Sequence, residues 1–135
     1  MRFEDFIEEG SVHKATPDPQ KAKALVNMAS NNLRVVKQIS LDDDSASLIL
    51  SSAYESLRQV LEAMAHTQGY KVFSHLAYTS YLSEKGEEGA SATFDRLRKL
   101  RNGVNYYGKS VPKEVTKQAL QDIELLCNKL QKKYL

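Results

Sequence analysis

Apolar residues recur every three or four positions along most of this chain, the spacing that places them on one face of an α-helix. Caps and turn residues divide the pattern into separate helices. A short first helix is expected from Phe3 until Gly10, and Asp18, as N-cap before a proline, opens the second. Five helices are predicted after the first one: Pro19 to about Ile39, the aspartates 42–44 to Gly69, about Ser74 to Leu82, about Ala90 to Tyr107, and from Pro112 onward.

These helices predict the fold class. Only three prolines and six glycines interrupt the pattern, and no segment has a convincing strand pattern. We therefore expect an all-α, up-down antiparallel helical bundle of four main helices plus short helices. The 135 residues fit one domain, residues 1–135, without an internal repeat or linker.

Several segments carry more detailed expectations. Residues 83–89 have the composition of an exposed loop. The aspartates at 42–44 are expected to cap a helix rather than bind a metal, because consecutive carboxylates point to different sides of a helix start. The apolar stripe of the long helix comprises Leu50, Ala53, Tyr54, Leu57, Val60, Leu61 and Met64. The last helix is expected to bury Val115, Ala119, Ile123, Leu126 and Leu130.

Composition points to a cytoplasmic protein. No run approaches the roughly 20 apolar residues of a membrane span, and the first residues lack the apolar stretch of a signal peptide. Cys127 is the single cysteine, so it cannot form an internal disulfide, and a reducing compartment is expected. No histidine or cysteine spacing suggests a metal site, and no motif suggests a cofactor.

The charge is distributed unevenly along the chain. Residues 1–93 hold nine lysines and arginines against thirteen aspartates and glutamates, whereas residues 94–135 hold ten against four. The basic excess of the second part suits an anionic partner such as RNA or a nucleotide. A solvated helix surface is the alternative explanation.

The segment from Arg98 to Gly108 carries the densest group of functional side chains. It ends an amphipathic helix whose apolar positions are Phe94, Leu97, Leu100 and Val104. A guanidinium beside amides and phenols can bind phosphate and stack on a base. The candidate RNA- or nucleotide-binding residues are Arg98, Arg101, Asn102, Asn105, Tyr106 and Tyr107. Arg101 is expected to stabilise the charge of a phosphate, and Arg98 is the weaker candidate.

A purely structural role is the alternative for each of these residues. Arg101 would then form a salt bridge to Glu55 or Glu62 on a neighbouring helix. The asparagine after it would bond within the helix end, and one of the tyrosines would pack in the core or a dimer interface. His75 is expected to cap or pack its short helix, and a nucleophilic pair with Cys127 has no supporting local signature.

Several short motifs, taken in order, resemble a prokaryotic branch of the HEPN (higher eukaryotes and prokaryotes nucleotide-binding) superfamily. The central motif is Arg101-Asn102 with an aromatic residue five positions after the arginine, on the penultimate helix of a small bundle. The others, spread over nearly the whole chain, are Phe3 to Gly10, Pro17-Asp18-Pro19, Ala53-Tyr54 with Leu57 and Leu61, Gly69-Tyr70-Lys71, His75, Phe94 to Asn102 and Tyr106-Tyr107-Gly108.

The resemblance implies a HEPN-like bundle that forms a homodimer and brings two arginine motifs into one cleft. Many members are RNases, often the toxin half of a toxin–antitoxin pair with a nucleotidyltransferase. Their motif continues from the arginine to a histidine, a position that falls here on Tyr106 or Tyr107. Imidazole titrates near neutrality and a phenol far above it, so a tyrosine is a poor general base.

Two functions therefore remain open. We favour an RNA- or nucleotide-binding module, possibly the partner of a nucleotidyltransferase in a toxin–antitoxin type system. The alternative is a metal-independent endoribonuclease, a toxin, in which Arg101, Asn102 and Tyr106 act on the scissile phosphate.

Overall fold

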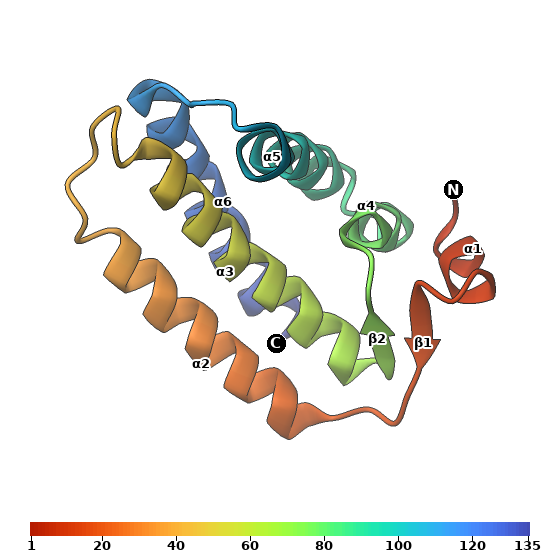
Figure 1. The fold of residues 1–135 in the computed structure, drawn as a ribbon. Helices are drawn as coiled ribbons and strands as arrows, with labels where there is room; N and C mark the ends of the chain where they lie inside the picture. The colour runs from red at the N-terminus through yellow and green to blue at the C-terminus, as the bar shows by residue number, and fades with distance from the viewer.

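The structure is a computed structural model that describes all 135 residues, and it is a bundle of helices with one small sheet (Figure 1). The elements in chain order are α1 (Phe3–Glu8), β1 (Val12–Lys14), α2 (Pro19–Val36), α3 (Ala46–Thr67), β2 (Tyr70–Val72), α4 (His75–Glu84), α5 (Glu88–Tyr107) and α6 (Lys113–Tyr134). The predicted all-α helical bundle is confirmed. No helix combines the length and the apolar character that crossing a bilayer requires.

The long helix α3 forms the centre of the bundle. Helix α2 runs along one side of it and α5 lies on the other, while α6 runs behind it in the view of Figure 1. Every residue of its predicted apolar stripe is buried, and so are polar residues outside that stripe, such as Ser56 and Gln59. A helix with neighbours on several sides buries more than one stripe, which the periodicity of a single face does not reveal.

A two-stranded antiparallel sheet connects the first residues to the segment between α3 and α4. Val12 lies opposite Val72 and Lys14 opposite Tyr70. The sequence pattern does not predict these strands, because each has only three residues and neither alternates over the four or more positions that a strand pattern needs. The sheet fixes the chain just before His75, where α4 begins.

The aspartates at 42–44 do not cap α3, whose N-cap is Ser45 without a side-chain cap bond, and instead satisfy backbone groups of the turn before it. The carboxylate of Asp42 accepts the N–H groups of Asp44 and Ser45, at 2.9 and 2.8 Å, and these bonds lower the pKa of Asp42. The carboxylate of Asp43 accepts the N–H of Lys113, at 3.0 Å. The triplet therefore holds the turn before α3 and also the start of α6.

The predicted loop at residues 83–89 is wrong in most of its length. Helix α4 extends to Glu84 and α5 begins at Glu88, so only three residues separate them. Within them, Glu87 is only 4% exposed and forms ion pairs with Lys133 and Lys129, at 2.7 and 3.4 Å. Glu87 is therefore an ion-paired connection to α6, whereas Glu84, Gly86, Glu88 and Gly89 are exposed, as the composition predicts.

Two helices differ from their expected limits or faces. Helix α2 ends at Val36, because the N–H groups of residues 38 and 39 bond three residues back, in turns. In α6, Val115 is 40% exposed and Leu126 is half-buried, so their predicted burial is wrong. The buried face instead includes Thr116, whose hydroxyl donates to the carbonyl of Ala46 at 2.9 Å. Because threonine counts as polar in the hydrophobic pattern, the predicted buried face of α6 began at Val115 instead of Thr116.

Candidate functional site

The last turns of α5 hold the candidate residues because the apolar side of the helix is anchored in the core. Phe94 and Leu97 are fully buried, and Leu100 and Val104 pack against the same core. The helix ends at Gly108, whose φ of +63° is the left-handed conformation that glycine adopts easily at a helix C-terminus. The residues between these points therefore have fixed directions relative to α3 and α4.

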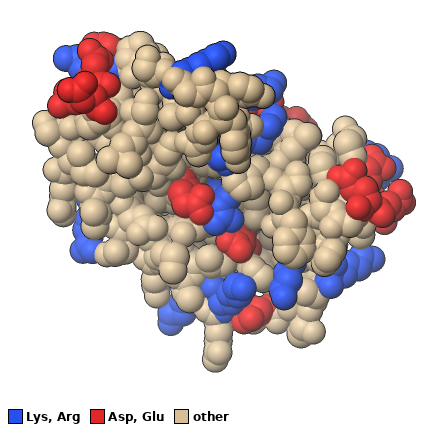
Figure 2. Space-filling model, in the orientation of Figure 1, with Lys and Arg blue, Asp and Glu red and all other residues tan.

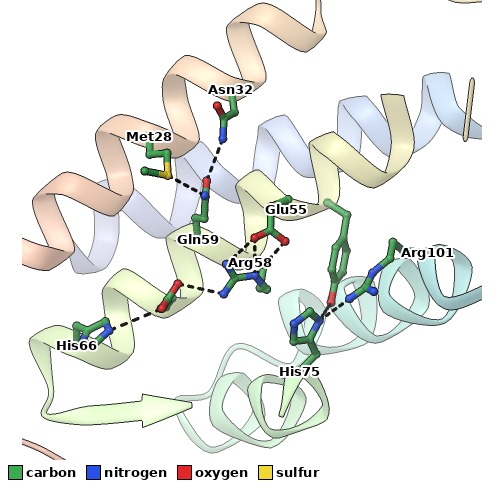
Figure 3. A network of polar contacts seen from close by, with 10 residues as sticks. Met28, Asn32, Glu55, Arg58, Gln59, His66, His75 and Arg101 are labelled. Carbon is green, nitrogen blue, oxygen red and sulfur yellow. Dashed lines mark hydrogen bonds and ion pairs between the residues drawn. The ribbon is translucent and has the colours of Figure 1, made fainter. Parts of the chain in front are cut away.

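The guanidinium of Arg101 points into the bundle, and the residue is only 7% exposed. Its Cζ lies 4.7 Å from the ring centroid of Tyr54 and 5.7 Å from that of Tyr106. Nη2 lies 2.6 Å from Nδ1 of His75 (Figure 3), and Nη1 lies 3.4 Å from the Tyr106 hydroxyl. Nε is buried and has no partner. Neutral groups from α3, α4 and α5 thus surround the charge.

No carboxylate pairs with Arg101. The salt bridge to Glu55 or Glu62, considered above as the alternative, is not formed. Arg58 binds both acids instead, with Nη2 2.5 Å from Glu55 and Nη1 3.0 Å from Glu62. Figure 3 labels Glu55 and Arg58 on α3, and Figure 2 shows acidic and basic side chains side by side in the middle of the face that it presents.

The hydrogen bonds of His75 determine where its proton lies. A guanidinium only donates, so Nδ1 must accept from Arg101 and carries no hydrogen. The Tyr54 hydroxyl, 2.9 Å away, is a second donor to the same lone pair. The hydrogen of the neutral ring is therefore assigned to Nε2. Burial, and next the charge of Arg101, lower the pKa of His75 to about 4, so the ring is neutral at pH 7.

Two of the tyrosines proposed for the site face solvent. Tyr106 is 70% exposed and Tyr107 is 76% exposed, at the end of α5. The ring of Tyr106 also covers one side of Arg101. Neither tyrosine packs in the core of this chain, so that alternative is wrong for both residues.

The remaining predicted site residues lie on the same helix and differ in their contacts. Asn102 is half-buried. The side-chain oxygen of Asn105 accepts a hydrogen bond from the Ser51 hydroxyl of α3, at 2.9 Å, which ties the end of α5 to the central helix. Arg98 pairs with Asp95, at 2.8 Å, so its charge is already compensated.

Two residues at this site were not among the predicted site residues, Tyr54 and His75. Tyr54 was assigned only to the apolar stripe of α3, and it is fully buried as expected. His75 was expected to pack its own helix, yet its ring bonds α3 and α5. They come from different helices, so no spacing in the sequence links them to the arginine.

The possible pair of Cys127 with His75 is not formed. Cys127 lines a groove with residues of α2, among them Ala29 and Leu33, whereas His75 contacts α3 and α5. Burial raises the pKa of the thiol to about 12. A buried, protonated thiol is a poor nucleophile, so this cysteine acts as a small apolar residue.

Comparison with known proteins assigns no family to the chain. No protein-family model matches it, and no curated protein has a significantly similar sequence. The HEPN resemblance therefore stays a prediction from short motifs, and the case for a function rests on the geometry around Arg101.

Proposed function

We propose that this protein is a HEPN-like module that binds RNA or a nucleotide, with a phosphate group held at Arg101. The observation that carries the proposal is the buried guanidinium of Arg101, which has no carboxylate partner and leaves its Nε unpaired. A buried charge without a counter-ion is costly and is found where a ligand supplies the opposite charge.

Other arginines of α3 and α5 provide the comparison. Arg58, Arg96 and Arg98 each form an ion pair with a carboxylate within 3.0 Å. Arg101 contacts only two phenol rings and an imidazole. A phosphate accepts two parallel hydrogen bonds from a guanidinium, and Nε with one Nη is a common pair of donors for it.

His75 supports the same ligand. Its Nδ1 is occupied by Arg101 and Tyr54, so the hydrogen on Nε2 is left to donate to another group. A neutral N–H donor beside a guanidinium suits a phosphate oxygen. His75 and Arg101 together therefore form the proposed phosphate site.

The residues around this site favour a nucleotide over a bare anion. Tyr106 exposes its ring beside Arg101, Tyr107 exposes its ring at the same helix end, and a base that stacks on such a ring gains about 1–3 kcal/mol. Asn102, one helical turn before Tyr106, offers amide groups to a base or a sugar. Asn105 keeps the helix end in position through Ser51.

A metal-independent endoribonuclease is the second candidate, and one observation favours it. The imidazole of His75 lies beside Arg101, although the sequence motif has tyrosine at the histidine position. With a pKa of about 4, however, only about one ring in a thousand is protonated at pH 7, and the neutral ring keeps its Nδ1 lone pair engaged. His75 therefore donates a hydrogen bond more readily than it transfers a proton, and binding is the preferred function.

The proposal includes the partners that the resemblance implies. A homodimer would bring two Arg101 sites together, and the exposed rings of Tyr106 and Tyr107 are suited to contact either a base or a second copy. A nucleotidyltransferase, in a toxin–antitoxin type system, is the proposed protein partner.

Fluorescence anisotropy with a labelled single-stranded RNA tests the proposed function. Arg101→Lys keeps the charge but loses the two-pronged geometry, and we expect it to weaken binding at least tenfold, about 1.4 kcal/mol. Arg96→Lys is the matched control, because Arg96 lies on the same helix, is exposed and pairs with Asp122. Equal loss in both variants would contradict a site at Arg101. Incubation of the same RNA in EDTA tests cleavage: products that require both Arg101 and His75 would favour the endoribonuclease.

A further inference from the structure

A groove of about 500 Å³ lies next to the Arg101 site, between α1, α4 and α5. Two of its lining residues connect it to that site. Leu76 directly follows His75, and Arg98 lies one helical turn before Arg101 on the same side of α5. Arg101 and His75 do not themselves line the groove, which begins one helical turn from the proposed phosphate site and extends toward the N-terminal helix.

The side of α5 that lines this groove at Asp95 and Arg98 stays polar beyond the groove, toward the C-terminal end of the helix. Asp95, Arg98 and Asn102 follow one another at helical spacing, and Tyr106 continues the series. At 1.5 Å per residue the series spans roughly 16 Å. A single nucleotide cannot contact both ends of such a stripe.

Basic groups predominate along the groove. Arg98 and Lys99 share one carboxylate, that of Asp95, at 2.8 and 3.1 Å. Arg2, which lines the opposite wall, is exposed and forms no ion pair. The other acid, Glu84, accepts the backbone N–H of Phe3 at 2.6 Å and so helps hold α1. Two cations, Lys99 and Arg2, are thus available to an anion.

We propose that the ligand of Arg101 is a single-stranded polynucleotide whose next phosphates lie in this groove, against Lys99 and Arg2. This inference rests on the proposed function and names the class of its ligand. One phosphate binds Arg101 and His75, a base stacks on Tyr106 at one end, and the strand continues along α5. Aromatic rings at the end of a basic groove are the usual arrangement for single-stranded nucleic acids.

The length dependence of binding tests the proposal. We would compare labelled uridine dinucleotide with the nonanucleotide, using wild type, the double variant Lys99→Gln with Arg2→Gln, and Lys117→Gln. Lys117 is an exposed lysine of α6 that forms no ion pair, so its replacement measures the effect of losing one positive charge away from the groove. The nonanucleotide should bind wild type more tightly, and the double variant should lose roughly tenfold of that affinity while its salt slope falls by about 1.4, or 0.7 for each lost contact. The dinucleotide should be unaffected.

The outcomes separate this proposal from the proposed function. Equal affinity for both lengths, with Arg101 still required, would leave the phosphate site in place and overturn the groove. Equal losses in the double variant and in Lys117→Gln would overturn it too. An oligoglutamate of the same charge that displaces the nonanucleotide equally well would assign the groove to acidic peptides. Absence of binding at either length would overturn both proposals.

Discussion

Arg101 donates a hydrogen bond to Nδ1 of His75 over 2.6 Å, although the two residues lie on different helices and 26 positions apart in the sequence. The bond determines the tautomer of His75 and keeps a cation against a neutral ring. A protonated His75 would direct a hydrogen from Nδ1 at the guanidinium. Protonation of His75 must therefore break this bond.

The stability of the protein should depend on the protonation of His75. Its pKa in the folded state, about 4, lies below its ordinary value of 6.5, so the unfolded state binds more protons between these two values. The stabilisation is present above about pH 6.5 and is lost as the pH falls toward 4. We expect a loss of about 2 kcal/mol across this range, less than the full shift would give because the ring is partly solvated.

Urea denaturation of wild type and of His75→Gln, at several pH values between about 7 and 4.5, isolates this contribution. Carboxylates titrate in both proteins, so only the difference between their free energies of unfolding reports His75. As the pH falls, the free energy of unfolding of wild type should decrease more than that of His75→Gln. A constant difference would contradict the assigned bond.

Replacement of Arg101 should cost little stability. Arg101→Met removes a buried, uncompensated charge and keeps an apolar stem over Tyr54, so the free energy of unfolding should stay within about 1 kcal/mol of wild type or rise. Arg58→Met should instead lower it by about 1–2 kcal/mol, because Glu55 and Glu62 lose their partner. Thermal melts of the two variants check the contrast. Larger destabilisation by Arg101→Met would assign Arg101 a structural role.

The exposed rings at the end of α5 should matter for binding and not for folding. Tyr107→Ala and Tyr106→Ala are each expected to leave the melting temperature nearly unchanged, because both rings are largely solvated. Loss of a stacked base should weaken RNA binding by about 1–3 kcal/mol in at least one of them. Leu125→Ala, an equally exposed position on α6, is the control. Unchanged RNA affinity in both tyrosine variants would exclude base stacking there.

Gly69 should be the least replaceable glycine of the chain. Its φ is +82°, and a Cβ there would lie 2.6 Å from the carbonyl oxygen of Ala15. Gly69→Ala is therefore expected to lower the free energy of unfolding by more than about 1 kcal/mol. Gly89→Ala has open space around it, within α5, and should stabilise by a few tenths to about 1 kcal/mol. Similar melting temperatures for the two variants would contradict this account of the turn before β2.

The helices were predictable from the sequence where apolar residues recur along one face and a capping residue marks the start. The stripe of α3 and the cap at Asp18 follow from local rules, and the structure confirms them. Errors arose where tertiary contacts override composition. Glu87 lies in a polar stretch that reads as a loop, yet two lysines of α6 hold it in a buried position. Thr116 reads as polar, yet a hydrogen bond to α3 permits its burial.

The candidate site was predictable only along α5. Arg101 and Tyr106 lie five positions apart, slightly more than one helical turn, and the guanidinium contacts the tyrosine hydroxyl. No local rule connects this helix to Tyr54 or His75, because the three helices meet only after folding. The pairing of Arg58 with Glu55 and Glu62, in contrast, follows the i,i+3 and i,i+4 spacing within α3, and it leaves Arg101 without a carboxylate.

NMR of arginine side chains tests the central claim, that Arg101 binds a phosphate, most directly. The Nε–H of Arg101 has no partner in the free protein, whereas that of Arg58 donates to Glu55 at 3.0 Å and serves as an internal reference. Titration with a short single-stranded RNA should shift the Arg101 Nε–H signal until it saturates, while the Arg58 signal stays in place. Saturable binding of RNA that leaves the Arg101 signal unmoved would contradict the claim.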